Sequence, residues 1–144
     1  YYVSQATRLE EVGIMPHRHT WGIWEMPIYY CDNTDFSERS YWYDGRPPFR
    51  KSVIENAVTR PGLYVFLFHP SHLALNTASL LGHQRVRDRF YNEDRRASPD
   101  LMFSGYGTMN FFADLVDAMQ RRNMVSRSLD EVFRLVRHEQ RWTP

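Results

Sequence analysis

Apolar residues form two runs of strand length in this chain. The clearer is Leu63–Phe68, a continuous apolar and aromatic run between Pro61-Gly62 and His69-Pro70. Apolar residues in succession are typical of a strand covered on both faces, as in parallel sheets. The stretch Trp24–Tyr30 is rich in aromatic and β-branched residues and predicts an earlier strand. Pro27 lacks a backbone N–H, so this strand is expected to be an edge strand or a distorted one.

Three segments show helical spacing instead. Phe49–Val58 has apolar residues at helical intervals, and Pro61-Gly62 ends it. Thr108 is placed to cap a helix that runs to about Arg122, with an apolar stripe on one face. A last helix is expected after Ser128, because Ser128 and Glu131 have capping-box spacing.

The remaining segments are less regular. Residues 36–48 have the composition of a loop, and the highly charged residues 83–99 favour a solvated helix followed by a loop. A binding arm for an acidic polymer is the less favoured alternative. Met124-Val125 is placed to form a short final strand.

The order strand, helix, strand, helix, helix predicts an α/β fold with parallel strands in one domain, residues 1–144. In such folds, sites form beyond the carboxyl ends of the strands. Asp32 and Asp35 follow the first strand, and His69 and His72 follow the second. We therefore expect the chemistry of the chain at these two strand ends.

His69-Pro70-Ser71-His72 is the strongest chemical signal. Histidine is suited both to proton transfer near neutral pH and to metal binding. If a helical turn follows, the two rings lie on one face. The alternative is a pair of hydrogen-bonded histidines without a catalytic role. For Asp32 and Asp35 the alternative is ordinary turn chemistry, and Asp32 is the closer of the two to the strand end.

Other candidates carry weaker signals. Large rings gather near the first strand and predict a cleft of carbohydrate size, in which Trp24 contacts substrate; core packing is the alternative. Asn76 either caps a helix or lines the site. Histidines elsewhere are expected at the surface. The rings are Trp21, Trp24, Tyr41, Trp42 and Tyr43, and the histidines are the pair His17 and His19 together with His83 and His138.

Composition excludes several classes of protein. Lys and Arg total 18 against 17 for Asp and Glu, a net charge of +1, so no broad nucleic-acid interface is expected. Cys31 is the only cysteine, which excludes an internal disulfide and favours a reducing, cytoplasmic compartment. No apolar stretch has the length of a membrane span. The first residues show neither an initiator Met nor a signal pattern, so we expect a fragment of a larger protein.

The segments Trp24–Asp32, Pro61–Thr77 and Gly105–Thr108 resemble a divergent branch of the polysaccharide deacetylases. These are the NodB-like enzymes of carbohydrate esterase family 4, and members of the branch resemble proteins encoded among genes for bacterial surface polysaccharides. The resemblance spans about Gly13 to Leu135, and its distinctive part is His-Pro-Ser-His.

The resemblance implies a distorted, partial β/α barrel and metal-dependent removal of acetyl groups from sugars, with a divalent metal, usually zinc. It implies that His69 is the late histidine that protonates the leaving group. Asp32 would orient a catalytic partner or contact substrate, and His72, Trp24, Asp35 and Asn76 would shape the substrate site.

This chain lacks the early Asp-Asp motif of the family and its metal-binding histidine spacing, since His69 and His72 are one residue too close. We therefore expect this chain to be the C-terminal part of a larger barrel that holds most of the metal site elsewhere. Two alternatives stay open. One is a non-catalytic, carbohydrate-binding or structural remnant of the fold. The other is a different metal hydrolase that uses His69 and His72 as ligands.

Overall fold

The computed structural model describes residues 16–18, 20–36, 47–92 and 101–138. Within them, four short strands form two separate sheets, each of two strands. β1 (His17–Arg18) pairs antiparallel with β2 (Trp24–Glu25), and β3 (Ile28–Cys31) pairs in parallel with β4 (Val65–Leu67). The predicted α/β class with parallel strands is confirmed by the β3–β4 pair, whereas no closed barrel is seen in this part of the chain.

The predicted strand Trp24–Tyr30 is broken into β2 and β3 at Met26-Pro27. Pro27 has no N–H to offer to a ladder, and the pairing of β3 is irregular between Ile28 and Tyr30. The distortion expected from Pro27 is therefore observed. All four residues of β3 are buried, and the Tyr29 hydroxyl donates to the carbonyl of Val53, 3.1 Å away, which fixes the strand to the helix below it.

β4 lies where the apolar run predicted a strand, but the expectation that both of its faces are covered is wrong. Val65 and Phe66 are half-buried, and Leu67 is 37% exposed. Among the described residues β4 pairs with β3 alone, so one hydrogen-bonding edge of β4 has no neighbouring strand there. The fully buried strand is its partner, β3.

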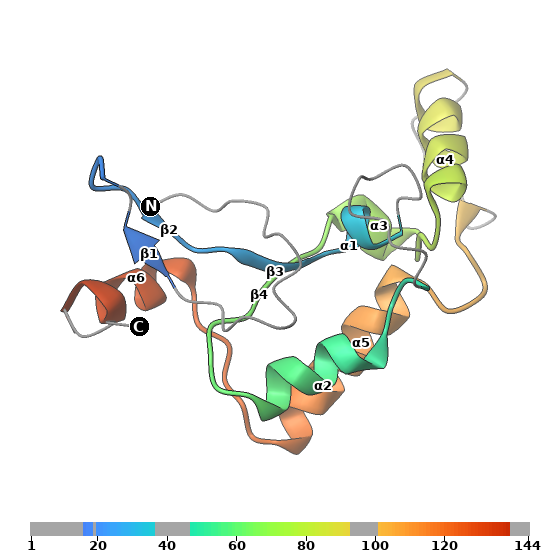
Figure 1. The fold of residues 1–144 in the computed structure, drawn as a ribbon. Coiled ribbons are helices and arrows are strands. Elements are labelled where there is room, and N and C mark those ends of the chain that lie inside the picture. Colours follow the sequence, from blue (N-terminus) through green and yellow to red (C-terminus); the bar gives the residue numbers. More distant parts are fainter. Residues whose placement is uncertain (1–15, 19, 37–46, 93–100, 139–144) are drawn as a thin grey trace.

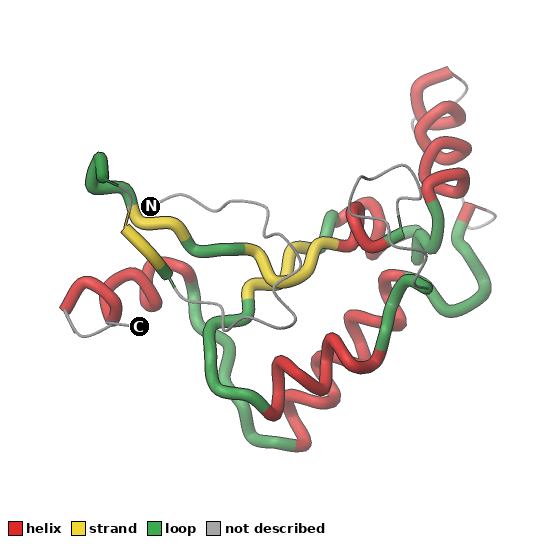
Figure 2. The backbone as a smooth tube through the Cα atoms, in the orientation of Figure 1, coloured by secondary structure: helices red, strands yellow, loops and turns green. Residues whose placement is uncertain are grey.

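The helices lie on one side of the β3–β4 pair and beyond both of its ends (Figures 1 and 2). α1 (Asp32–Asp35) follows β3 directly, where a turn was expected. α2 (Lys51–Thr59) and α5 (Thr108–Arg121) run side by side below the strands, while α4 (Leu80–Asn92) projects away from them. α3 (Pro70–Ala74) and α6 (Leu129–His138) complete the set.

The helix ends agree closely with the sequence. The N-cap of α5 is Gly107, so Thr108, predicted as the cap, is the first helical residue. α6 begins after the predicted capping box, in which the Ser128 amide donates to Glu131 Oε2 at 2.7 Å and the Glu131 amide donates to Ser128 Oγ at 3.2 Å. The predicted strand at Met124-Val125 is wrong, since neither residue pairs and Val125 is 82% exposed. Predictions for residues 37–46 and 93–100, and for His19, lie outside the described residues.

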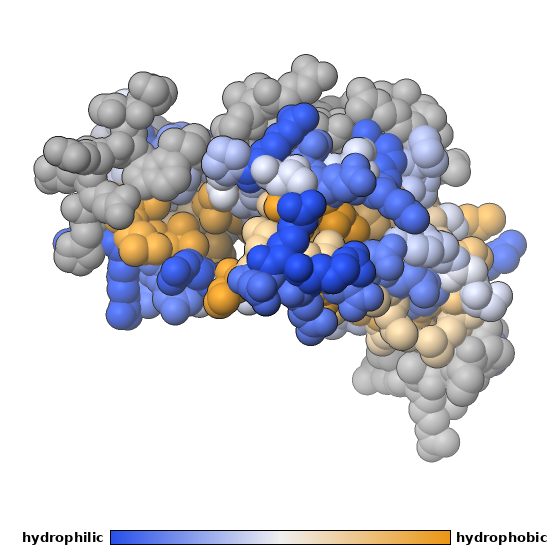
Figure 3. All heavy atoms as spheres, turned by 90° about the horizontal axis from the view of Figure 1, so that it is seen from below, coloured by the Kyte–Doolittle hydropathy of each residue, from blue (hydrophilic) through white to orange (hydrophobic). Residues whose placement is uncertain are grey.

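The core is a cluster of aromatic rings between the strands and α2 and α5. Phe111 is fully buried, and the centroid of its ring lies 4.9 Å from that of Tyr30 and 5.7 Å from that of Phe49. Figure 3 views the molecule from below, where hydrophilic residues cover much of the surface and hydrophobic ones gather in smaller areas between them. The apolar stripe predicted for α5 is thus core at Phe111 and Leu115, whereas Phe112, also part of that stripe, is 39% exposed.

Candidate functional site

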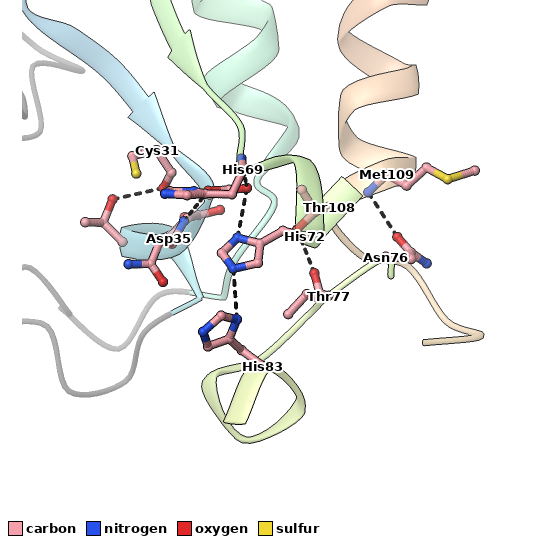
Figure 4. Close-up of polar contacts among 12 residues, drawn as sticks. Cys31, Asp35, His69, His72, Asn76, Thr77, His83, Thr108 and Met109 are labelled. Atoms are coloured by element: carbon pink, nitrogen blue, oxygen red, sulfur yellow. Dashed lines mark hydrogen bonds and ion pairs between the residues drawn. The ribbon is translucent and has the colours of Figure 1, made fainter. Parts of the chain in front are cut away.

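Polar residues converge at the carboxyl ends of β3 and β4. Cys31 is the register partner of Leu67, so the residues that follow each strand leave the sheet at the same edge. Asp32 then opens α1. His69 stands directly before α3 (Figure 4). The two strand ends at which the sequence places the candidate residues therefore lie side by side.

The side chain of Asp32 is fully buried and accepts four hydrogen bonds. Oδ1 accepts from Nδ1 of His69 and from the amide of Asn33, both at 2.6 Å. Oδ2 accepts from the amide of His69 at 2.9 Å and from Nδ1 of His72 at 3.1 Å. A carboxylate offers about four acceptor positions, so the carboxylate of Asp32 is saturated.

These donors determine the charge of Asp32. Burial alone would raise the pKa of the carboxyl group, because a buried charge loses its hydration. The hydrogen bonds from His72 and from the backbone and ring of His69 act in the opposite direction and outweigh it, so the pKa of Asp32 lies below its ordinary value. Asp32 is therefore a carboxylate at neutral pH.

His69 is the accessible member of the pair. Its backbone is extended at φ −85° and ψ 129°, and Pro70 begins the helix behind it, which fixes the position of the ring. The ring is 42% exposed. Because a carboxylate only accepts, Nδ1 of His69 carries the proton, and no described residue hydrogen-bonds to Nε2. A buried carboxylate that orients an exposed imidazole is suited to proton transfer.

His72 lies behind His69 and is 3% exposed. The two ring centroids are 4.8 Å apart, so the spacing of three residues does place both rings together, as expected for a helical turn. Nδ1 of His72 bonds to Asp32, and Nε2 lies 3.0 Å from Nδ1 of His83. With both nitrogens engaged and the ring buried, His72 is placed to hold Asp32 rather than to contact a sugar.

His83 was expected at the surface, and that prediction is wrong. It lies in the first turns of α4, is half-buried and contacts His72 with the rings at 90°. Burial lowers the pKa of His83, and the nearby His72 and Arg87 lower it further. The charged sequence around His83 gave no signal for this contact, which depends on how α4 turns back toward α3.

The structure does not bring the other candidates to His69. The carboxylate of Asp35 accepts from the Tyr30 hydroxyl at 3.1 Å and from the amide of Phe49 at 2.7 Å, which ties α1 to the start of α2. Trp24 lies in β2, before the first residue of β3, whereas Asp32 follows the last residue of β3 (Figure 1).

Asn76 is buried, and its amide holds the segment before α5. Its Nδ2 donates to the carbonyls of Phe103 and Gly105 at 2.9 and 2.8 Å, and its Oδ1 accepts from the amide of Met109 at 3.0 Å. The amide nitrogen and oxygen of this side chain are thus both used within the fold. Asn76 caps the start of α5, which is one of the two roles predicted for it.

A candidate group for a metal ion is present in Cys31, Asp32 and His69, whose ligand atoms lie within 4.8 Å of one another. Sequence reasoning considered Cys31 only for disulfide formation and redox compartment. The group fits an ion poorly as arranged, because the carboxylate of Asp32 is saturated and Nδ1 of His69 points at it. The alternative with His69 and His72 as ligands is not supported either, since both nitrogens of His72 are engaged.

Comparison with known proteins gives two matches. A sequence model of the WbmS-like family, described as polysaccharide deacetylase, matches residues 2–87. A crystal structure from Bordetella bronchiseptica, of a proposed polysaccharide deacetylase involved in O-antigen biosynthesis (WbmS), matches with 21% identity and a TM-score of 0.49. This match covers 85% of the present chain and 44% of the other, so the chain spans less than half the length of that protein. No curated protein matches.

Proposed function

Because the chain belongs to the WbmS-like family of polysaccharide deacetylases, we propose that it supplies the general acid of a carbohydrate deacetylase. The family predicted from the sequence is confirmed. The observation that supports this role is the 2.6 Å contact between the buried Asp32 carboxylate and Nδ1 of the exposed His69. The proposed substrate is an acetylated sugar of a surface polysaccharide.

The proposal includes the finer points that the resemblance implies. The chain would form the C-terminal part of a distorted β/α barrel, with β3 and β4 as two of its parallel strands. A divalent metal, zinc by resemblance, would be held by residues other than Asp32, since the carboxylate of Asp32 has no acceptor position left. Among the described residues, none of the helices has the length and apolar character to cross a membrane.

His69 would act as follows. The carboxylate of Asp32 accepts a hydrogen bond from Nδ1–H and stabilises the imidazolium form of the ring, while the proton stays on Nδ1. The Nε2 proton then passes to the nitrogen or oxygen of the sugar as its bond to the acetyl carbon breaks. Loss of that proton leaves a neutral imidazole that is still hydrogen-bonded to Asp32. The fixed ring orientation spares the reaction the entropy of aligning the donor.

The test is acetate release from acetylated sugar oligomers. His69→Ala is expected to lower kcat/KM by about 10²–10⁴, the usual contribution of a general acid. His17→Ala is the matched control, since His17 is an exposed histidine in β1 that pairs with Glu25 at 3.3 Å. A His69→Ala variant as fast as the wild type would rule out the general-acid role.

The non-catalytic alternative rests on one observation, that the only candidate metal group in the described part of the chain fits an ion poorly. In that case the wild type releases no acetate, and His69→Ala binds acetylated oligomers as tightly as the wild type in isothermal titration calorimetry. Acetate release that depends on His69 would exclude this alternative.

A further inference from the structure

The hydrogen bonds that link Asp32, His72 and His83 run in a defined direction. A carboxylate can only accept, so Nδ1 of His72 donates across the 3.1 Å contact to Asp32. A neutral imidazole carries one N–H, and therefore Nε2 of a neutral His72 is a lone pair. That lone pair is buried, because His72 is 3% exposed, and a buried acceptor needs a donor.

His83 is placed to be this donor. Its Nδ1 lies 3.0 Å from Nε2 of His72, which is ordinary hydrogen-bond length. Because the pKa of His83 is lowered, its ring is neutral at neutral pH and has one proton to place. With that proton on Nε2, two lone pairs would face each other unless His72 carried a second proton. With it on Nδ1, every buried nitrogen in the contact is satisfied.

Both rings are held in place by the backbone around them. The amide of His72 donates to the carbonyl of His69 at 2.9 Å, and the Phe36 ring packs 5.0 Å from the His72 ring. The amide of His83 donates to the carbonyl of Ser79 at 3.0 Å, which starts α4 beside the site. The first turns of α4 thus reach the site, while the rest of the helix projects away (Figures 1 and 4).

We propose that His83 is a positioning residue for the pair Asp32–His69. By donating from Nδ1 to Nε2 of His72, it holds His72 in the tautomer that donates to Oδ2 of Asp32. That bond stops the carboxylate from rotating and keeps Oδ1 on the ring of His69. The effect on catalysis rests on the proposed function, whereas the tautomers of His72 and His83 do not.

The first experiment determines the tautomers directly. Long-range ¹H–¹⁵N spectra of the 144-residue chain at neutral pH should show both His72 and His83 neutral and protonated at Nδ1. A His83 protonated at Nε2, or a His72 protonated at both nitrogens, overturns the proposal. So does a stoichiometric shift of Nε2 of His72 and Nδ1 of His83 on adding Zn²⁺, which would make them metal ligands instead.

Two near-isosteric variants extend the test. The amide nitrogen of Asn stands close to the position of Nδ1, whereas that of Gln stands close to Nε2. In His83→Leu, the Nδ1–H resonance of His72 should move away from the chemical shift that it has when hydrogen-bonded to Asp32. His83→Asn should restore the wild-type chemical shift, and His83→Gln should not. Equal spectra for the Asn and Gln variants, or an unchanged signal in His83→Leu, would overturn the role of the Nδ1 donor.

Activity gives a separate readout. If the wild type releases acetate, His83→Leu should lower kcat with little change in KM, because His83 acts through His72 and not on substrate, and His83→Asn should recover most of the loss. His17→Ala again serves as the control. If the wild type releases none, the proposed function fails on its own, and the spectra still decide the tautomers.

Discussion

At the scale of single residues, the site is organised around one buried carboxylate. Asp32 takes its four hydrogen bonds from α1, from the backbone and ring of His69, and from α3. Its place after a strand was predictable from the sequence, and so was its proximity to His69. The number of its donors was not, because that depends on side-chain rotamers and on the direction in which α1 and α3 leave the sheet.

Replacing this carboxylate by an amide is expected to destabilise the fold. Asp32→Asn presents an NH₂ group to donors that need an acceptor, so the free energy of unfolding should fall by about 1–3 kcal/mol. Urea denaturation of the two proteins measures the difference. Asp130→Asn is the control, since Asp130 is 52% exposed in an ion pair with Arg134 and should matter by less than about 0.5 kcal/mol.

The same variant gives a pH dependence. The pKa of Asp32 is lowered in the folded state, so the unfolded chain binds the proton more readily. The contribution of Asp32 is thus fully present above its unfolded value, about 3.9, and is lost as the pH falls through the lowered pKa. The stability difference between wild type and Asp32→Asn should shrink over that acid range. A difference that stays constant from neutral pH down to that range would contradict the assignment.

At the scale of elements, the helices were the predictable part. Caps and apolar stripes are local signals, and α5 and α6 start where Thr108 and the Ser128–Glu131 pair indicate. The strands were less predictable, because their limits depend on partners that are far away in the sequence. Pro27 split one strand, and β4 is half-exposed although its sequence is that of a buried strand.

The start of α5 depends on a close approach between Gly107 and Asn76. A Cβ on Gly107 would overlap the backbone oxygen of Asn76, which has little freedom to move because φ of Asn76 is 49° and its side chain is fully bonded. We expect Gly107→Ala to lower the free energy of unfolding by about 1–3 kcal/mol, the usual cost of an overpacked site.

Gly82→Ala is the matched control for this substitution. Gly82 lies in α4, where the nearest atom to an added Cβ is Ser79 Oγ at 3.3 Å. This oxygen needs to shift only slightly, and it can do so while it still accepts from the Gly82 amide, 3.1 Å away. Alanine is preferred over glycine in a helix by about 1 kcal/mol, so this variant should be neutral or more stable. Thermal unfolding followed by circular dichroism compares the two. Equal effects would show that the approach to Asn76 is unimportant.

At the scale of the whole molecule, aromatic packing links the site to the helices below it. Tyr30 is next to the site in β3, and its ring packs against Phe66, Phe68 and Phe111. The sequence predicted the stripe of α5 that holds Phe111 as core, whereas Phe66 and Phe68, from the run expected to be a fully covered strand, are only half-buried. It did not predict the arrangement of the sheets, because two separate strand pairs and one barrel sheet share the same local patterns.

Truncating Phe111 should destabilise the whole fold. Phe111 lies on α5 and is fully buried, with its ring against Tyr30 of β3 and against Phe49 just before α2. Phe111→Ala should therefore cost about 3–5 kcal/mol in the free energy of unfolding. Phe112→Ala is the control, because Phe112 is 39% exposed and touches only part of this cluster, through Phe68. Urea unfolding monitored by fluorescence should separate the two neighbours, and a similar cost for both would contradict the assigned core.

The parallel register of β3 and β4 determines where changes in chain length are tolerated. Asp32 and His69 are 37 positions apart, yet they meet because Cys31 stands opposite Leu67. Residues added between α2 and β4, around Arg60, would lengthen an exposed connection and leave the two strand ends together. A single residue inserted within Val65–Leu67 would move His69 one residue further along the strand and turn its side chain to the opposite face, so the imidazole would no longer meet its carboxylate.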